Sequence, residues 1–267
     1  MWKNKSKEIL TLSFDDSYQK TVKNTLPLLN QYQMVASFNV IVNLIGKEFE
    51  GLKLASYADL KKAASQEIEI ASHSLTHTDL VKRGRIRKFL KSFPQQHHRI
   101  KLIKENLKSA FKQKKKKRCQ INQSLLEEEI IKSKTILTKK GFDIASFVYP
   151  SGAYNKKIKD FVGNYYSSAR SLDTGLNDYQ IKDFYALKAF TWYKWTTPSV
   201  ANRWVDKAIK KKAWLIEVFH FVADKNKTDY KHFTSVADFE EHLKYIKSRN
   251  IWVATQKEVV KYIQGKK

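Results

Sequence analysis

Side chains that can bind a metal ion or move a proton gather where predicted strands end. The strand predicted over 9–14 runs into the adjacent carboxylates Asp15 and Asp16, and further along the chain His73 and His77 stand four residues apart. If that segment forms one helical turn, both imidazoles lie on one face and can share a metal ion. A carboxylate from another strand end would complete a three-ligand site with open positions.

This ligand set does not by itself select one metal or one reaction. Two histidines and one carboxylate suit catalytic zinc, and they equally suit an Fe(II) oxygenase. The histidine pair could also lie on a helix surface or cap a helix, and adjacent aspartates are common in solvated turns. The spacing alone therefore leaves a metal centre and a structural role open.

The elements that must position these residues alternate between apolar strands and amphipathic helices. Such alternation predicts parallel β/α units, with a barrel favoured over an open sheet, and sites in these folds form at the carboxyl ends of the strands. No glycine-rich phosphate loop follows a strand, which disfavours nucleotide-binding folds. Strands are expected at 9–14, 35–42, 67–71, 144–149, 165–169, 186–192, 214–221 and 251–254, and helices at 22–32, 57–64, 125–140, 200–212, 236–249 and 256–263.

Length and composition exclude several classes of protein. The 267 residues are 42% hydrophobic, which is enough for one large core or two small ones. No run approaches 18 apolar residues, so we expect no transmembrane segment. A single cysteine, Cys119, excludes an internal disulfide framework. No apolar signal core precedes the first strand, so we expect a cytoplasmic protein or a secreted form whose leader has been removed. The sequence indicates no oligomeric state.

Positive charge is concentrated in one segment. The chain holds 51 Lys and Arg against 26 Asp and Glu, and residues 82–118 alone supply 15 of the 25 net positive charges. We expect a basic, helix-prone insert at about 84–120 that interrupts the alternation. It could bind an anionic surface or polymer, such as an acidic glycan, a teichoic acid or phospholipid surface, or nucleic acid. A solvated loop is the alternative interpretation.

Taken together, four segments resemble the motifs of the polysaccharide deacetylase family, the NodB-like carbohydrate esterases. They occur in the family's order and span nearly the whole chain apart from the insert. The resemblance implies a single catalytic domain over 1–267 with an α/β fold, a distorted (β/α) barrel. The segments are Ser-Phe-Asp-Asp at 13–16, Ser-His-Ser-Leu-Thr-His at 72–77, Phe-Val-Tyr-Pro-Ser-Gly-Ala-Tyr-Asn at 147–155 and Val-Phe-His at 218–220.

The resemblance also assigns roles to individual residues. Asp16, His73 and His77 match the metal triad, most often Zn²⁺ in this family, with Co²⁺ or Ni²⁺ as other divalent cations. Asp15 matches the catalytic base and His220 the general acid. A bound divalent cation polarises a carbonyl and lowers the pKa of its water towards ~7. Adjacent strand residues point to opposite sides, so we expect a bend that brings Asp15 and Asp16 to the same metal.

Two positions depart from the family pattern. The common third motif carries an arginine that orients the base, but Val148 stands at the matching position here, and we take Arg170 as its replacement. The fourth motif, an aspartate near a tryptophan that tunes the acid histidine, is not clear. Trp192 and Trp195 are candidates for a wall that stacks on sugar rings. We expect His232 and His242 to face solvent.

The resemblance implies the hydrolysis of N-acetyl groups from a glycan that contains N-acetylglucosamine, of the chitin, peptidoglycan or exopolysaccharide type. An O-acetyl esterase acting on xylan-type substrates, or a catalytically impaired glycan- or polyanion-binding module on the same fold, are the alternatives. A backbone N–H near Ser151 matches the oxyanion donor. Besides Trp192, the residues expected to contact substrate are Tyr149, Pro150, Ser151, Gly152 and Tyr154.

Overall fold

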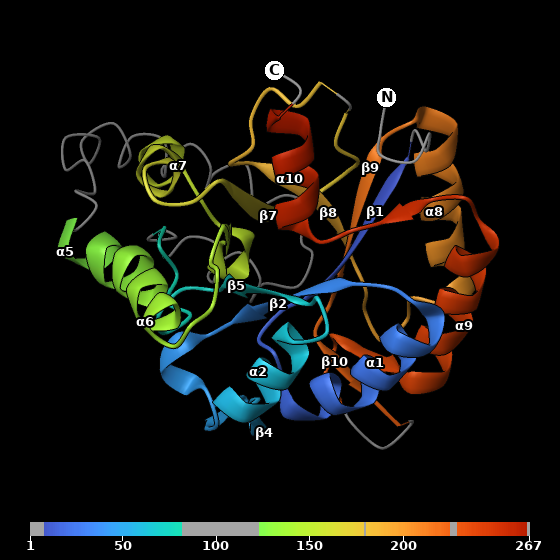
Figure 1. The fold of residues 1–267 in the computed structure, drawn as a ribbon, viewed down its shortest axis with the longest axis horizontal. Helices are drawn as coiled ribbons and strands as arrows, with labels where there is room; N and C mark the ends of the chain where they lie inside the picture. Colours follow the sequence, from blue (N-terminus) through green and yellow to red (C-terminus); the bar gives the residue numbers. More distant parts are fainter. Residues whose placement is uncertain (1–7, 82–122, 179, 225–228, 266–267) are drawn as a thin grey trace, which may run out of the picture.

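The structure is a computed structural model that describes residues 8–81, 123–178, 180–224 and 229–265 (Figure 1). The predicted basic insert at about 84–120, together with Cys119, lies outside the described residues, and its predicted helical character is therefore not tested. No helix in the described part of the chain is both long and apolar enough to cross a bilayer.

Seven parallel strands close into a barrel, which confirms the predicted distorted (β/α) barrel. The strand order is β1-β2-β5-β6-β7-β8-β9, and β9 pairs back along the full length of β1. A further strand, β12 (Trp252–Val253), pairs with the start of β1. The barrel strands are β1 (Ile9–Phe14), β2 (Ala36–Val40), β5 (Glu69–Ser72), β6 (Ser146–Val148), β7 (Ser168–Thr174), β8 (Leu187–Thr191) and β9 (Trp214–Phe219).

Helices cover the outside of the barrel, and short strands lie at its rim (Figure 1). Two pairs of short strands were not predicted: β3 (Glu48–Phe49) with β4 (Leu52–Lys53), and β10 (Phe221–Ala223) with β11 (Phe233–Ser235). The helices are α1 (Gln19–Tyr32), η2 (Val42–Leu44), α2 (Tyr57–Ala64), α5 (Gln123–Leu126), the π-helix η3 (Glu127–Lys132), α6 (Ser133–Lys139), η4 (Pro150–Gly152), α7 (Lys156–Gly163), α8 (Pro198–Lys211), α9 (Val236–Ser248) and α10 (Gln256–Gln264).

Alternation along the strands separates an apolar outer layer from a more polar interior. Phe14 at the end of β1 packs against Phe219 of β9 and Phe239 of the covering helix α9. Thr11 and Ser13 alternate with these apolar residues along β1 and are fully buried. Since strand side chains alternate between faces, polar groups of β1 line the barrel interior and lead towards its carboxyl end.

Helix α10 closes the amino end of the barrel. Its first backbone N–H groups donate to side chains at the starts of two strands, from Gln256 to Ser37 Oγ (3.1 Å) and from Lys257 to Glu69 Oε2 (3.0 Å). The Gln256 side chain donates to Ser168 Oγ at the start of β7 (2.9 Å). The carboxylate of Glu69 thus lies at a helix N-terminus, where the helix dipole favours negative charge.

Strand β7 begins three residues later than predicted. The backbone N–H groups of Tyr165 and Tyr166 both donate to Val162 O, so the turn that ends α7 occupies the first residues of the predicted strand. The other barrel strands start within two residues of their predicted positions. The later start places Arg170 inside the strand, opposite Val148 of β6, rather than just beyond it.

Candidate metal centre and acid–base site

A tight bend at the end of β1 brings both aspartates to the mouth of the barrel. Asp15 continues the strand, because its N–H donates to Phe219 O at 2.8 Å. Asp16 and Ser17 then adopt left-handed backbone conformations, with φ of 63° and 54°. Such φ values are uncommon for residues other than glycine and often mark functional sites. The Ser17 hydroxyl donates to Asn39 O at 3.0 Å and holds this bend.

The structure brings Asp16, His73 and His77 together. Asp16 Oδ1 lies 3.6 Å from His73 Nε2 and 3.7 Å from His77 Nε2. The other ring nitrogen of His73, Nδ1, lies 3.0 Å from Val148 O on β6 and can donate to it. A backbone acceptor at Nδ1 selects the tautomer whose free Nε2 lone pair faces Asp16, as in many metal-binding histidines.

The loop after β5 positions His77 through Glu129, a residue that the sequence analysis did not single out. Ser74 and His77 both have left-handed φ, 67° and 63°. Glu129 Oε2, on the π-helix η3, accepts the N–H groups of Leu75 (3.0 Å) and Thr76 (2.9 Å). The Glu129 side chain is buried. Its carboxylate therefore holds the loop immediately before His77.

The donor set of Asp16, His73 and His77 fits a divalent cation. Asp16 Oδ1 is buried and has no hydrogen-bond partner among the described residues. Burial first, and then the negative charge of Asp15, raise the pKa of the Asp16 carboxyl well above its usual range. Burial also lowers the pKa of His73 to about 3 and depresses that of His77. Neutral imidazoles beside a carboxylate that lacks a counter-charge are what a Zn²⁺-type ion requires.

Asp15 is paired with Arg170. Burial alone would raise the pKa of Asp15, but the charge of the fully buried Arg170 outweighs it and holds that pKa well below its usual range. Arg170 Nη2 donates to Asp15 Oδ1, and Asn39 Nδ2 donates to the same oxygen at 2.7 Å. Arg170 Nη1 donates to Ser171 O at 3.1 Å, which fixes the guanidinium. Asp15 is therefore ionised at neutral pH and held in one orientation.

His220 lies on the other side of Asp15. Its Nε2 is 3.8 Å from Asp15 Oδ2, and burial lowers the pKa of His220 to about 3 although Asp15 opposes the shift. The other nitrogen, Nδ1, has no hydrogen-bond partner among the described residues. Instead the ring lies against His232, with ring centres 4.4 Å apart. The prediction that His232 faces solvent is wrong, because this residue is half-buried beside His220.

The second histidine expected at the surface, His242, is also buried. It lies on α9, and its Nε2 is 2.7 Å from Glu217 Oε2 of β9 while Nδ1 is 2.8 Å from Asn202 Oδ1 of α8. His242 and Glu217 are both completely buried. This prediction is therefore wrong, because the helix face that carries His242 packs against the barrel wall.

Trp192 does not form a surface for stacking on sugars. Its side chain is fully buried, and its ring lies 4.9 Å from Phe219 and 5.1 Å from His242. The residue follows β8 directly and is covered by α8 and α9, so its expected contact with substrate is corrected. Trp195, three residues later, is 64% exposed.

The third motif divides into buried and exposed residues. The side chains of Tyr149 and Pro150 are buried, and the Tyr149 hydroxyl donates to Tyr185 O at 3.0 Å, which corrects their expected direct contact with substrate. Ser151 is exposed at the rim, and Gly152 and Tyr154 are half-buried. Tyr154 stacks on Tyr149 with ring centres 5.0 Å apart.

Gly152 is required for this loop to approach β7. Its φ is +66°, and a Cβ built there would lie 2.6 Å from the backbone nitrogen of Leu172. Real Cβ atoms do not approach backbone so closely, so only glycine keeps the loop against the strand. The glycine thereby sets the position of the preceding Ser151 at the rim.

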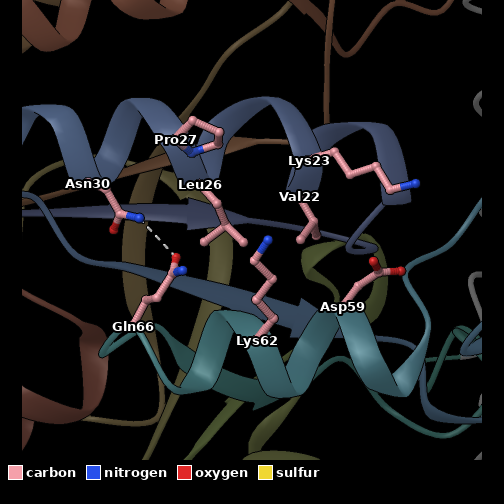
Figure 2. A pocket seen from close by; sticks show the side chains of 8 residues that line it. All are labelled: Val22, Lys23, Leu26, Pro27, Asn30, Asp59, Lys62 and Gln66. Atoms are coloured by element: carbon pink, nitrogen blue, oxygen red, sulfur yellow. Dashed lines mark hydrogen bonds between the residues drawn. The ribbon is translucent and has the colours of Figure 1, made fainter.

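A hollow of about 320 Å³ lies between α1 and α2 (Figure 2). One wall is bridged by a hydrogen bond from Asn30 to Gln66 at 3.1 Å. None of the residues at the barrel mouth lines it, so it is separate from the candidate metal centre. Its lining residues are Val22, Lys23, Leu26, Pro27, Asn30, Asp59, Lys62 and Gln66.

The fold and the site together define a (β/α) barrel with a candidate metal centre at its carboxyl end. The sequence profile of the family described as polysaccharide deacetylase matches residues 3–165. The chain therefore belongs to the polysaccharide deacetylase family. A comparison with curated protein sequences finds no significant match.

Solved structures share the fold at low sequence identity. A protein from Mycobacterium smegmatis assigned to the polysaccharide deacetylases has a TM-score of 0.59 at 10% identity, with 100% of this chain and 93% of that chain covered. The Xyl-CE4 domain of a multidomain xylanase from the hindgut metagenome of Trinervitermes trinervoides gives 0.55 at 15% identity, covering 97% and 91%.

Other structural relatives are longer. A CE4 family pseudoenzyme from Bacillus anthracis gives a TM-score of 0.54 at 11% identity, covering 97% of this chain and 66% of that chain. This chain spans 45% of the length of another Bacillus anthracis relative assigned to the polysaccharide deacetylases, at 19% identity and a TM-score of 0.45, with 67% of this chain covered.

Proposed function

We propose that this protein is a metal-dependent deacetylase that hydrolyses N-acetyl groups on amino sugars of a glycan. The observation that carries the proposal is the convergence at one barrel mouth of an ionised carboxylate, Asp15, with the candidate metal ligands Asp16, His73 and His77. The family relationship supports acetylated glycans as the substrate class. No other group of at least three metal-ligating side chains occurs among the described residues.

Asp15 is suited to act as the base that takes a proton from the attacking water. Its carboxylate is ionised and oriented by hydrogen bonds from Arg170 and Asn39 to Oδ1, which leave Oδ2 available. The positive charge of Arg170 makes Asp15 a weak base, so the water must itself be acidified. A divalent cation held by Asp16, His73 and His77 would supply that acidification and would also polarise the acetyl carbonyl.

His220 is placed to pass a proton to the leaving nitrogen; its pKa of about 3 makes it neutral at neutral pH, so it donates only after it has taken up a proton during the reaction. The C–N bond of an amide breaks only when the departing amine receives a proton, and an imidazole can supply it. His220 Nε2 lies on the same side of the mouth as Asp15 Oδ2. The N–H of Ser151, at the rim, would donate to the oxyanion, a contact whose loss typically reduces the rate by about 10²- to 10³-fold.

Acetate release from N-acetylglucosamine oligomers tests this proposal. We expect release that stops on chelation, returns with Zn²⁺ or Co²⁺, and falls by at least about 10²-fold in Asp15→Asn, because an amide cannot accept the proton. Asp143→Asn is the matched control, since this aspartate is exposed and pairs with Lys257 on the surface. Metal binding without acetate release from a broad set of acetylated glycans would indicate a binding module instead.

A specific observation favours a second candidate, an O-acetyl esterase. Among the described residues, His220 Nδ1 has no acidic partner that would keep the ring protonated. An alcohol leaves more readily than an amine and needs less help from a general acid. Comparison of acetate release from acetylated xylan and from chitin oligomers separates the two candidates: a clear preference for xylan selects the esterase.

Binding of a polyanion through residues 82–118 remains a prediction. The segment carries sixteen basic residues and one acid. Counterion release makes such binding weaken steeply as salt rises. Binding that does not change between low and physiological ionic strength would contradict it.

A further inference from the structure

A short hairpin, formed by β3 and β4, lies against the candidate metal centre. Its tip is a two-residue turn that begins with Glu50, which has a left-handed φ of 51°. The ring of Phe49, just before the turn, lies 5.1 Å from the ring of His77 between centres. After the hairpin, the N–H of Ala55 donates to Ser17 O at 2.9 Å, within the bend that ends β1. The turn is therefore held at the mouth of the barrel from two sides.

The carboxylate of Glu50 is held in place although the residue is exposed. The Tyr230 hydroxyl donates to this carboxylate and lies 3.2 Å from the hydroxyl of Tyr18. Tyr18 is completely buried two residues after Asp16, and it forms an antiparallel bridge with Leu54 at the end of the hairpin. A carboxylate on an exposed turn is ordinarily free to rotate in solvent. This one is fixed at the mouth by a pair of tyrosine hydroxyls.

The negative charge of Glu50 acts on both sides of the mouth. Burial lowers the pKa values of His77 and His232, and the charge of Glu50 opposes the shift at each of them. The hydrogen-bond donor to Glu50 is a neutral hydroxyl, which leaves the negative charge in place. A divalent cation and Arg170 together would exceed the charges of the two aspartates by one positive charge, and Glu50 cancels that excess.

We propose that Glu50 makes the barrel mouth discriminate against anions, so that acetylated glycans bearing carboxylates are poorer substrates than neutral ones and the acetate product leaves more readily. The inference rests on the proposed function and deepens it, because it specifies the charge of the substrate. The chain as a whole carries a net charge of +25 and attracts anions. The fixed charge of Glu50 opposes that attraction at the mouth, and the opposition weakens as salt screens it.

Two oligomers that differ only in charge test the preference for neutral substrates. Acetate release is measured at low salt on chitopentaose and on chitopentaose oxidised to carboxylates at C6, with the wild type, Glu50→Gln and Glu50→Asp. We expect Glu50→Gln to raise the ratio of kcat/KM on the oxidised oligomer to kcat/KM on the neutral one by about three- to tenfold, as removal of a unit charge several ångströms away would. The rise shrinks at about 0.5 M salt. Glu50→Asp keeps the charge and therefore keeps the wild-type ratio.

Glu48→Gln is the matched control, since it removes the same charge from the same hairpin at an exposed position opposite Lys53. We expect it to leave the ratio at the wild-type value. Three results would overturn the proposal. The first is an unchanged ratio in Glu50→Gln, and the second is an equal rise in both variants, which would reflect the net charge of the chain. The third is a rise in Glu50→Gln that is the same at low and high salt, which would reflect packing instead of charge.

A binding measurement separates failure of this inference from failure of the proposed function. Acetate is titrated into the Zn²⁺-supplemented protein, and broadening of its methyl NMR signal gives the dissociation constant without turnover. If no acetylated glycan is hydrolysed, the deacetylase proposal fails, and the role of Glu50 is judged by acetate binding alone. A dissociation constant about three- to tenfold lower in Glu50→Gln than in the wild type and Glu48→Gln supports the inference. Equal constants in all three proteins, or no binding to any of them, overturns it.

Discussion

Both ends of the barrel bury polar side chains, but the two ends differ in the hydrogen-bond partners that these side chains have. At the amino end, the chain itself partners most of them: α10 donates backbone N–H groups to Ser37 and Glu69, and Ser37 Oγ donates to Glu69 Oε2 at 2.6 Å, while Glu69 Oε1 has no hydrogen-bond partner among the described residues. At the carboxyl end, Asp16 Oδ1 and His220 Nδ1 have no hydrogen-bond partner among the described residues.

The difference separates stability from function within one barrel. A buried polar group with its partners in place stabilises one folded state, whereas a buried group without a partner destabilises the fold unless a ligand supplies the partner. The amino end therefore holds the barrel closed, and the carboxyl end is arranged for molecules from outside the chain. Variants at the two ends should accordingly divide into those that lower stability and those that lower chemistry.

Arg170 should be an exception to this division, because its substitution is expected to lower both the stability of the fold and the activity of the site. Arg170→Ala leaves Asp15 buried without its counter-charge, and we expect the free energy of unfolding to fall by about 3–5 kcal/mol. The pKa of Asp15 should rise, so the acid limb of the pH–rate profile moves to higher pH. Urea unfolding and the pH dependence of acetate release measure the two effects. An unshifted acid limb would separate Arg170 from the base.

Glu69→Ala should lower stability without affecting chemistry. The change leaves the Ser37 hydroxyl and the Lys257 N–H without their acceptor, so we expect a loss of about 2–3 kcal/mol in the free energy of unfolding. The kcat of the folded enzyme should stay near the wild-type value. The neighbouring Glu67→Ala, at an exposed position, should leave both quantities unchanged. A large fall in kcat for Glu69→Ala would contradict the separation of the two ends.

Glu129→Ala should weaken metal binding. Without the carboxylate, the loop that carries His77 loses two of its hydrogen bonds, and losses of about 10- to 100-fold in metal affinity are typical of such supporting groups. Competition with a chromogenic chelator measures the affinity. Glu128→Ala is the matched control, because Glu128 is exposed and pairs with Lys132 one turn away. Equal affinities in the two variants would leave Glu129 without a part in the metal site.

His220 should make stability depend on pH. Burial lowers its pKa from 6.5 to about 3 in the folded chain. Below pH 6.5, His220 therefore binds a proton in the unfolded chain but stays neutral in the folded chain until the pH approaches 3. Its contribution is therefore complete above pH 6.5 and declines as pH falls towards 3, by about 1.4 kcal/mol per pH unit. Urea unfolding at pH 7 and pH 5.5, with a chelator present, should show a smaller decline in His220→Asn than in the wild type. Identical declines would contradict this.

Sequence could predict the barrel and the positions that meet at its mouth, because strand ends and motif spacing are local features of the chain. The position of Arg170 near Asp15 could be predicted because its strand and the strand that carries Val148 are consecutive along the chain, and adjacent parallel strands end at one edge of the sheet. Burial was harder to predict. Trp192 and His242 were misplaced because the packing of α8 and α9 on the barrel decides which faces are covered.

Some supporting groups left no pattern to find. Asn39 stands within a buried strand, and its role depends on Asp15 lying beside it at the end of the neighbouring strand β1. Glu129 acts across a sequence separation of more than fifty residues on the loop before His77. A single polar residue within a buried strand is a usable clue for the first case. The role of Glu129 depends on a π-helical turn, which no pattern in the sequence predicts.

The start of β1 and helix α10 both lie at the end of the barrel remote from the mouth (Figure 1). Strand β12, which precedes α10, pairs with the start of β1, and the N–H of Trp252 donates to Glu8 O at 3.2 Å. Attachment to a bead, a sensor chip or a fused protein through this side would leave the opening pointing into the surrounding liquid. An enzyme tethered in this way could work on an insoluble coat or particle without having to detach from its own support.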